Sequence, residues 1–365
     1  MIMRKKLIAT MLLLGMALLM LTGCGKKENE KSNTSNQEAE RITTSQKDEE
    51  YMASEQAAEE AAKAEVSEAE VYHYYYNQLT AEEKGMYDSI LASKEELINN
   101  QPISVYSFNS KEMLDYSAIG EGLTRAYTAC LLDNPEISMW INTFEYYMEV
   151  EKLLNEDFQQ TGVTCNIHIK VAEGRASYGN FSTPEETRQA VSEVEAKSKE
   201  FVRTLEGLSD EEKAIQIHNW ILEDAKYDST LSHSNIRNLY GAIIQKECVC
   251  AGFAYGFKFI GDMAGIDTLI VSGKGVTPFT TENGSHAWNN ICINGTWSLI
   301  DLTWDCNKTP IYEEAEETYV EGDRYMVSKT YTVVGTTYGT DYLFKPLEEA
   351  EQTHIASESF DVPHT

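Results

Sequence analysis

The sequence predicts an α+β protein, because signals for amphipathic helices and for antiparallel strands both occur along the chain. Three helix starts place Glu three residues after Ser or Thr, so that hydroxyl and carboxylate accept reciprocal backbone N–H bonds; they begin at Thr80, Thr183 and Ser209. Apolar side chains alternate within 164–171, as they do in a half-buried strand. The dipeptide Asn294-Gly295 stands between two further apolar runs and predicts a hairpin.

Residues 1–23 have the organisation of a secretory signal peptide. Basic residues at 4–6 precede an apolar run, 7–21, which ends in Leu-Thr-Gly before Cys24. This ending resembles the bacterial lipobox, which implies cleavage before Cys24 and attachment of lipid to it. An uncleaved membrane-spanning anchor is the alternative, although the run is shorter than the roughly 20 residues that a spanning helix needs. Both interpretations predict an extracytoplasmic protein held at the cell membrane.

Residues 24–70 are expected to form a polar tether. The segment is rich in Lys, Glu, Asn, Ser, Gln and Ala, with Tyr51 as its only aromatic residue, so it buries too little apolar surface to offset the entropy of ordering. The whole chain carries 30 Lys and Arg against 59 Asp and Glu, a net charge of -29. Such a surface repels nucleic acid and anionic headgroups, so we expect no nucleic-acid partner and a membrane attachment that depends on Cys24.

Two flanking parts of the folded chain carry no predicted chemistry. Residues 71–180 are expected to form a small α+β module, with the helix that begins at Thr80 and two strand-like segments, 139–148 and 164–171. Residues 311–365 are expected to complete the central sheet or to cover its cleft. The chemistry is therefore expected between these parts, in a core at 181–310.

Cys250 stands at the start of a predicted helix within this core. Aromatic and apolar residues follow at helical spacing and the pattern ends at Gly265. The partial positive charge of a helix N-terminus stabilises a thiolate, and reactive cysteines occur in that setting. Taken alone, a cysteine at such a position is more often a small buried core residue, so the interpretation depends on its neighbours.

The predicted hairpin brings His286 and Asp301 together. With Asn294-Gly295 as a two-residue turn, Asp301 lies opposite Trp288, which makes His286 and Asp301 diagonal neighbours on one face. Diagonal neighbours lie about 7–8 Å apart, near enough for an imidazole N–H to reach a carboxylate. A three-residue loop would put the pair on opposite faces. Asp305 is a rival to Asp301, because the same register places it on the same face.

Three sequence blocks resemble the motifs of the transglutaminase-like, papain-related superfamily, in the order found in that family. They are 249–254, 286–289 and 300–305, and the lead-in helix around 217–221 also looks like that of the family. The resemblance covers about 210–305. It implies an α+β fold in which the helix of the nucleophile packs on an antiparallel sheet that carries the other two residues.

The resemblance also implies roles for single residues. Cys250 is expected to be the nucleophile, His286 its base, and Asp301 the residue that orients the imidazole. The backbone N–H of Cys250 and the side chain of Tyr240 are candidates for binding the oxyanion. Cys248 departs from the family pattern, in which a small residue is common at this position.

The implied activity is cysteine-dependent acyl transfer on protein or peptide amides of the cell envelope. Transfer to water gives proteolysis or deamidation and transfer to an amine gives a crosslink, and the triad alone does not choose between them. A transglutaminase-like binding module without catalysis is the alternative. A solute-binding lipoprotein has little support, because the chain lacks the long alternation of strands and helices of a two-lobed α/β protein.

The 7 cysteines do not predict a disulfide framework. Once Cys24 is lipidated and Cys250 is reserved as nucleophile, an odd number remains. A pair between Cys248 and either Cys292 or Cys306 stays open, because an exported protein meets oxidants. No metal or other cofactor is expected: a zinc site built on Cys248, Cys250 and a histidine would need the unusual Cys-x-Cys spacing.

Overall fold

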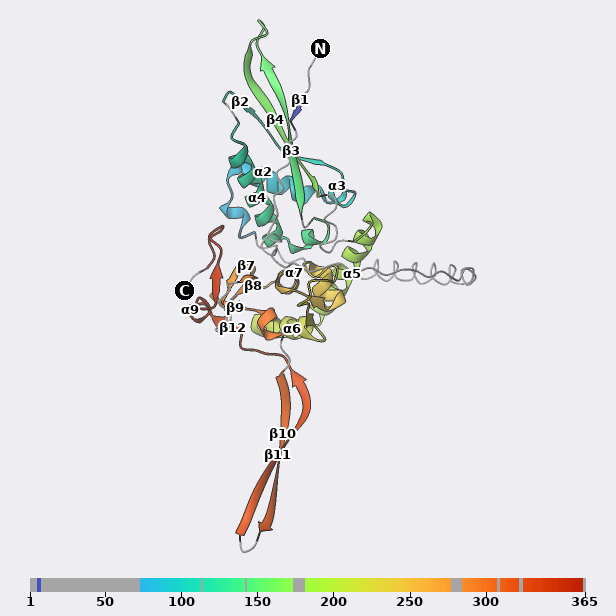
Figure 1. The fold of residues 1–365 in the computed structure, drawn as a ribbon, viewed down its shortest axis with the longest axis vertical. Coiled ribbons are helices and arrows are strands. Elements are labelled where there is room, and N and C mark those ends of the chain that lie inside the picture. The colour runs from blue at the N-terminus through green and yellow to red at the C-terminus, as the bar shows by residue number, and fades with distance from the viewer. Residues whose placement is uncertain are drawn as a thin grey trace, which may run out of the picture. The chain divides into compact units, whose positions relative to one another are not determined.

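The computed structural model describes residues 5–7, 73–112, 114–141, 143–172, 181–276, 284–306, 309–321 and 324–363 (Figure 1). Cys24, the tether and the signal segment lie outside these ranges, apart from the short strand β1 (Lys5–Leu7). In the described ranges no helix combines the length and the apolarity that crossing a membrane requires.

The chain forms two compact units. Among the described residues, unit 1 takes Lys5–Leu7 and those within Leu79–Leu131 and Ile137–Gly207, and unit 2 takes those within Val71–Gln78, Leu132–Glu136 and Leu208–Thr365. The helix α5 (Pro184–Arg203), which we placed in the core at 181–310, groups with unit 1. In unit 1 its Arg188 donates to the carboxylate of Glu95 at 3.0 Å.

Unit 1 combines helices with an antiparallel sheet of order β1-β3-β4-β2. Its other elements are α2 (Ala81–Ala92), α3 (Lys94–Ile98), β2 (Ile103–Ser110), α4 (Tyr116–Asp133), the 3-10 helix η3 (Pro135–Met139), β3 (Phe144–Leu154) and β4 (Gln160–Val171). The predicted strand at 139–148 begins later, at Phe144, because η3 with Pro135 at its first position precedes it. The alternation in 164–171 is confirmed, since Cys165, Ile167 and Ile169 are fully buried.

The capping signals hold, with one difference. Thr80 and Glu83 form the reciprocal pair at the start of α2. Thr183 accepts from the Glu186 N–H as predicted, but the Glu186 carboxylate accepts from Ser182 N–H, one residue further upstream. Each capping side chain satisfies N–H groups that the first helical turn leaves unpaired.

Unit 2 is built on a five-stranded sheet of order β12-β9-β8-β7-β13. Its central strands are β7 (Thr268–Gly275), β8 (Gly284–Ile293) and β9 (Thr296–Ile300). The C-terminal extension supplies both edges, through β12 (Leu343–Pro346) and β13 (His354–Ala356), with the short helix α9 (Leu347–Ala350) between them. Leu347 and Ala350 join Val271, Trp288 and Leu299 in one apolar cluster, so this extension is part of the core.

Unit 2 also contains helices and short elements. They are the 3-10 helix η2 (Tyr76–Gln78), α6 (Asp210–Leu222), β5 (Lys226–Tyr227), the π-helix η5 (Gly241–Gln245), β6 (Glu247–Cys248), α7 (Cys250–Met263) and α8 (Leu302–Asp305). The capping box of Ser209 and Glu212 opens α6 as predicted. The helix α7 contacts β7, β8 and α6. It buries Phe253, Phe257 and Ile260, and each such side chain contributes roughly 1.5–3 kcal/mol.

Two short upstream segments belong to unit 2 although the sequence analysis assigned them to the module at 71–180. The hydroxyl of Tyr75 donates to the Ile270 carbonyl at 2.6 Å. The carboxylate of Asp133 accepts from the backbone N–H groups of Tyr75 and Tyr76. These buried bonds hold both segments to the unit that contains the sheet.

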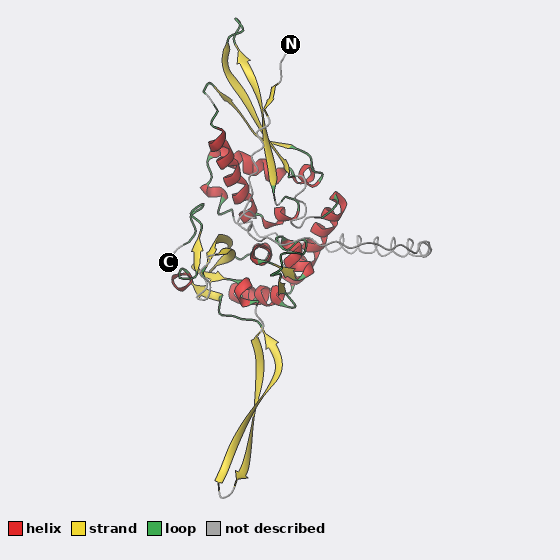
Figure 2. Cartoon of the chain, in the orientation of Figure 1, coloured by secondary structure: helices red, strands yellow, loops and turns green. Residues whose placement is uncertain are grey.

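A long hairpin interrupts the extension. Its strands, β10 (Thr309–Glu321) and β11 (Arg324–Thr337), pair only with each other (Figure 2). After β11 the chain returns to the end of α8, where Gly339 N–H donates to the Asp305 carbonyl at 2.9 Å. The hairpin therefore begins and ends close to the end of α8.

The predicted register of the second hairpin is confirmed. Ile293 pairs with Thr296 and Asn289 with Ile300, around the two-residue turn. Asn294 has φ 53° and the following glycine has φ 79°, the pair of positive values that such a turn requires. The expectation that one strand carries both Asp301 and Asp305 is wrong, because β9 ends at Ile300 and α8 follows.

Candidate active site

Cys250 is the first residue of α7. The side chain of the preceding Val249 does not cap the helix. The backbone N–H groups of the first turn, starting with that of Cys250, therefore have no partner within the helix. Gly252 lets this turn pack closely, because a Cβ there would lie 2.6 Å from the Cβ of Cys248. The sulfur is thus fixed at the positive end of a buried helix, and only 7% of the Cys250 surface is exposed.

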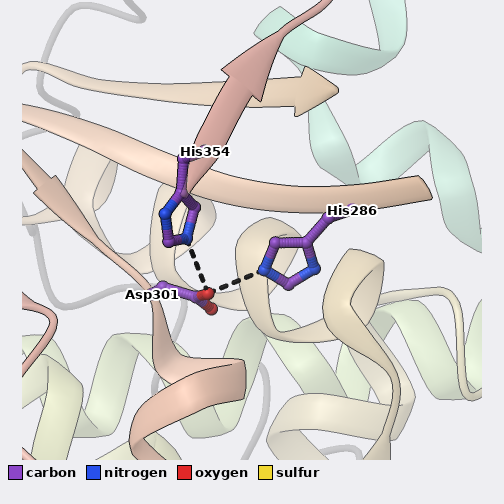
Figure 3. Close-up of side chains that lie close together, drawn as sticks. All are labelled: His286, Asp301 and His354. Atoms are coloured by element: carbon purple, nitrogen blue, oxygen red, sulfur yellow. Dashed lines mark hydrogen bonds and ion pairs between the residues drawn. The ribbon is translucent and has the colours of Figure 1, made fainter. Parts of the chain in front are cut away.

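The imidazole and the carboxylate meet as the register predicts. His286 Nε2 lies 2.7 Å from Asp301 Oδ2, and both side chains are buried (Figure 3). His286 comes from β8, whereas Asp301 follows the last residue of β9. A bond of this length between an imidazole and a carboxylate is charge-assisted.

Both carboxylate oxygens of Asp301 accept hydrogen bonds. Oδ1 accepts from the backbone N–H of Thr303 at 2.8 Å and of Trp304 at 3.4 Å, which makes Asp301 the N-cap of α8. Oδ2 accepts from two imidazoles, those of His286 and His354. Burial works to raise the pKa of Asp301, but the imidazoles outweigh it and lower this pKa to about 2. The carboxylate is therefore ionised at every physiological pH.

Cys250 is the other partner of the His286 ring. Burial alone would lower the pKa of His286; the Asp301 carboxylate and a hydrogen bond with the Cys250 side chain outweigh burial and raise it to about 10. The His286 ring thus contacts Asp301 through Nε2, and the Cys250 side chain is near enough to the ring to contribute to its raised pKa.

The segment that carries these three residues has known relatives. Residues 197–302 match the model of the transglutaminase-like superfamily. This part of the chain is a transglutaminase-like core. The predicted family and the α+β fold class, with its antiparallel sheet, are confirmed.

The relatives cover limited parts of the chain. Kyphoscoliosis peptidase of Homo sapiens is 31% identical over 126 residues, which span 31% of this chain and 19% of that protein. The Mus musculus protein is 30% identical over 108 residues, spanning 27% and 16%. The chain thus matches less than a fifth of the length of these curated relatives.

Two solved structures also align with parts of the chain, at low TM-scores. A crystal structure of a TGase aligns with a TM-score of 0.29 and 15% identity, over 54% of this chain and 50% of that chain. A putative cysteine protease from Cytophaga hutchinsonii aligns with a TM-score of 0.23 and 13% identity, over 44% and 64%.

The rival carboxylate of the transglutaminase-like core has another partner. Asp305 lies in α8, and its Oδ2 is 3.3 Å from Nε2 of His218, a fully buried residue of α6. Its Oδ1 accepts from Tyr342 N–H at 3.2 Å. The predicted strand, 297–304, would have put the two carboxylates on one face, but the turn into α8 directs them to different histidines.

Cys248 differs from Cys250 in its surroundings. It is completely buried in β6, and burial, followed by the nearby Cys306 and Cys250, raises the pKa of its thiol well above the usual value. A thiol in that setting stays protonated and is a poor nucleophile. Cys248 carries a thiol in the structure, so neither of the two disulfide pairs left open for it is formed.

Two tyrosines stand as candidates for substrate contact. Tyr240 caps η5 and donates its backbone N–H to Asn238 at 3.0 Å; its role in binding the oxyanion stays a prediction. Tyr227, to which the sequence analysis gave no role in the site, is 40% exposed, and burial of its remaining surface together with charge on Cys250 raises its pKa to about 12. Its neutral phenol is available as a hydrogen-bond donor.

Two groups of described side chains are close enough to share a metal ion. The first is His286, Asp301 and His354, whose polar atoms already bond to one another as described above. The second centres on Asp228, whose carboxylate accepts from the N–H groups of Thr230, Leu231 and His233. In both groups hydrogen bonds within the protein satisfy the carboxylate without an ion.

Proposed function

We propose that unit 2 is a cysteine acyl-transfer enzyme that acts on protein or peptide amides. The observation that carries the proposal is the buried 2.7 Å contact between His286 and Asp301, with the Cys250 side chain near enough to the His286 ring to contribute to its raised pKa. A thiolate beside an imidazolium held by a carboxylate is the arrangement that attacks amide carbonyls. The transglutaminase-like match of 197–302 supports the same class of chemistry.

The residues divide the chemistry between them. The Cys250 thiolate attacks the carbonyl carbon of the amide, and the negative charge that develops on oxygen faces the N–H groups at the start of α7. His286 gives its proton to the departing nitrogen as the C–N bond breaks, which leaves a thioester on Cys250. Water or an amine then attacks the thioester, His286 accepts the proton of that attacker, and the thiolate returns.

The test of this proposal is the pH dependence of iodoacetamide alkylation at each cysteine, mapped by peptide mass spectrometry. We expect Cys250 to be alkylated at pH 6 while Cys292 is not, because the proposed imidazolium partner stabilises the Cys250 thiolate. His286→Ala removes that partner and should move the reaction of Cys250 to alkaline pH. Cys292 serves as an internal control, because it is half-buried and lies outside the triad.

An outcome in which Cys250 reacts only at alkaline pH, or in which His286→Ala changes nothing, would reject the enzyme. The chain would then be a transglutaminase-like binding module, and its ligand would be sought by retention of envelope peptides without turnover. Alkylation needs no substrate, so either result separates the two functions before a substrate is identified.

We also propose that the enzyme is anchored in the cell envelope by lipid on Cys24. The motif at the end of the apolar run supports this location. Two or more acyl chains give stable attachment, since each buried CH₂ contributes about 0.8 kcal/mol. Cys24→Ala should abolish incorporation of radiolabelled palmitate and leave the unprocessed precursor. Unchanged processing and membrane attachment in this variant would instead support a spanning anchor.

A further inference from the structure

His354 is a buried polar residue that the mechanism above does not use. It lies in β13, 52 residues beyond the end of the segment that matches the transglutaminase-like superfamily, and only 1% of its side chain is exposed. A buried imidazole needs a partner for each ring nitrogen. Its Nε2 is 3.1 Å from Asp301 Oδ2, and its Nδ1 is 2.9 Å from Thr353 Oγ1.

The Asp301 carboxylate determines which ring nitrogen of His354 is the donor towards it. An ionised carboxylate only accepts hydrogen bonds, so Nε2 of His354 carries the proton that points at Asp301. The Thr353 hydroxyl donates to the Ala350 carbonyl at 3.2 Å and lies 2.9 Å from Nδ1 of the ring. The two dashed lines that converge on one carboxylate oxygen in Figure 3 are thus both donated to Asp301.

Aromatic side chains fix the plane of the His354 ring. The ring of Trp304 lies 4.4 Å from it and also stacks on His286 at 5.5 Å with an interplanar angle of 20°. Trp288 approaches it edge-on at 4.9 Å. Both imidazoles and the indole of Trp304 therefore form one packed group around Asp301, which leaves the carboxylate little room to rotate.

The backbone is shaped to bring β13 to this place. His354 pairs with Gly275 of β7 and Ala356 pairs with Gly273. A Cβ on Gly273 would overlap the carbonyl oxygen of Ile355, and one on Gly275 would lie 3.3 Å from the His286 ring. Glycine at these two positions leaves room beside β7 for the strand β13, which carries His354, and for the ring of His286.

We infer that His354 is a positioning residue that holds the Asp301 carboxylate in the orientation in which it fixes the His286 imidazole. The inference rests on the proposed function, since it assigns a partner to that triad. Both oxygens of the carboxylate accept hydrogen bonds: Oδ1 from the first turn of α8, and Oδ2 from His354 as well as from His286. The C-terminal extension thus completes the active site as well as the sheet.

The test compares His354→Gln with His354→Met in the full-length protein. The two side chains have similar size, but the glutamine amide N–H reaches the position of Nε2 and the methionine has no donor. We expect His354→Met to lower the rate of Cys250 alkylation at pH 6 by about 10–100-fold, the loss typical when a residue that orients a functional histidine is removed. His354→Gln should restore most of that rate.

A second readout does not depend on the reactivity of Cys250. In protein labelled with ¹⁵N-histidine, the proton on His286 Nε2 should give a downfield signal protected from water in the wild type and in His354→Gln. In His354→Met this signal should be lost to exchange. A wild-type protein whose Cys250 fails to react at pH 6 but whose His286 signal depends on His354 would reject the proposed function and retain the positioning role.

His218→Met is the matched control, because His218 is buried against Asp305, outside the triad. It should lower the melting temperature without changing the pH profile of alkylation or the His286 signal. Equal alkylation rates and equal His286 signals in the Gln and Met variants of His354 would overturn the inference. So would one equivalent of zinc in the purified wild-type protein that is absent from His354→Met, because His354 would then be a metal ligand.

Discussion

Replacing Cys250 by alanine is expected to abolish acyl transfer while leaving the free energy of unfolding within about 1 kcal/mol of the wild type. The reaction forms a thioester on the Cys250 sulfur, and neither the oxyanion donors nor the imidazole can replace that bond. Loss of a nucleophile lowers turnover by at least about 10⁴-fold, as removal of one member of a catalytic triad does. Ammonia release from glutamine peptides and new amino groups from casein measure both products of the reaction with water.

Two cysteines provide controls for this variant. Cys248→Ala tests the neighbour two residues away, whose buried thiol has a raised pKa. Cys292→Ala tests a half-buried thiol on β8. Both should retain turnover in proportion to the folded fraction. Turnover that survives Cys250→Ala and is lost in Cys248→Ala would move the nucleophile to β6.

Replacing Asp301 by asparagine should destabilise the protein by on the order of 3–5 kcal/mol between pH 4 and 6.5, the usual cost of breaking a buried ion pair from one side. The carboxylate accepts from two imidazoles and from the N-terminus of α8, and an amide oxygen offers no charge to any of them. Turnover should fall by roughly 10⁴-fold, because the orientation and tautomer of His286 are no longer fixed. Urea unfolding and the turnover assays measure the two effects.

The pH dependence of this stability difference follows from the two pKa shifts. The pKa of His286 is raised to about 10, so its contribution is complete below the unfolded value of about 6.5 and is lost as pH rises through 10. The pKa of Asp301 is lowered to about 2, so its contribution is complete above the unfolded value of about 3.9 and is lost as pH falls through 2. The difference between wild type and variant should therefore form a plateau between these limits.

The alkaline and acid declines can be separated. In a His286→Gln background, the stability difference caused by Asp301→Asn should no longer decrease at alkaline pH, because the imidazole whose pKa is raised is gone. The acid decline should persist, since His354 still donates to Asp301. A stability difference that stays constant from pH 3 to pH 10 would show that the pair is not ionic in the folded protein.

The part of the site that local signals specify could be predicted from the sequence. Asn294 and Gly295 favour positive φ, so they set a two-residue turn and with it the register that brings His286 and Asp301 together. The start of α7 was equally accessible, because its apolar spacing ends where the strand signal of β7 begins. These elements depend on neighbours within about ten residues, and for that reason the sequence alone locates them.

The turn at Asp301 was not predicted because two local preferences compete there. The run through 297–304 has the apolar composition of a strand, but aspartate is a strong N-cap and its side chain binds the N–H groups of Thr303 and Trp304. In the structure Asp301 is an N-cap, and the helix α8 stands where the end of the strand was expected. Because of this turn, Asp301 lies against His286 and Asp305 lies against His218. An alternating pattern of apolar residues does not predict that difference.

His354 was missed for a different reason. It is separated from Asp301 by 53 positions and by the long hairpin of β10 and β11. The sequence around it has no motif, and no local signal states that β13 pairs with β7. Pairs of this kind depend on tertiary packing, as do Tyr75 and Asp133, which join unit 2 from positions far upstream. The sequence feature that came nearest to indicating His354 was its place beside Thr353, at the start of a short strand between polar residues.

The most direct test of the central claim is capture of the acyl-enzyme. Wild-type protein is mixed with a glutamine peptide, quenched in acid within one turnover, and analysed by intact and peptide mass spectrometry. The account predicts an adduct with the mass of the peptide less ammonia, located on Cys250, labile to hydroxylamine, and absent from Cys250→Ala. An adduct on another residue, or product formed from a range of peptides without any adduct, would contradict a thioester mechanism at Cys250.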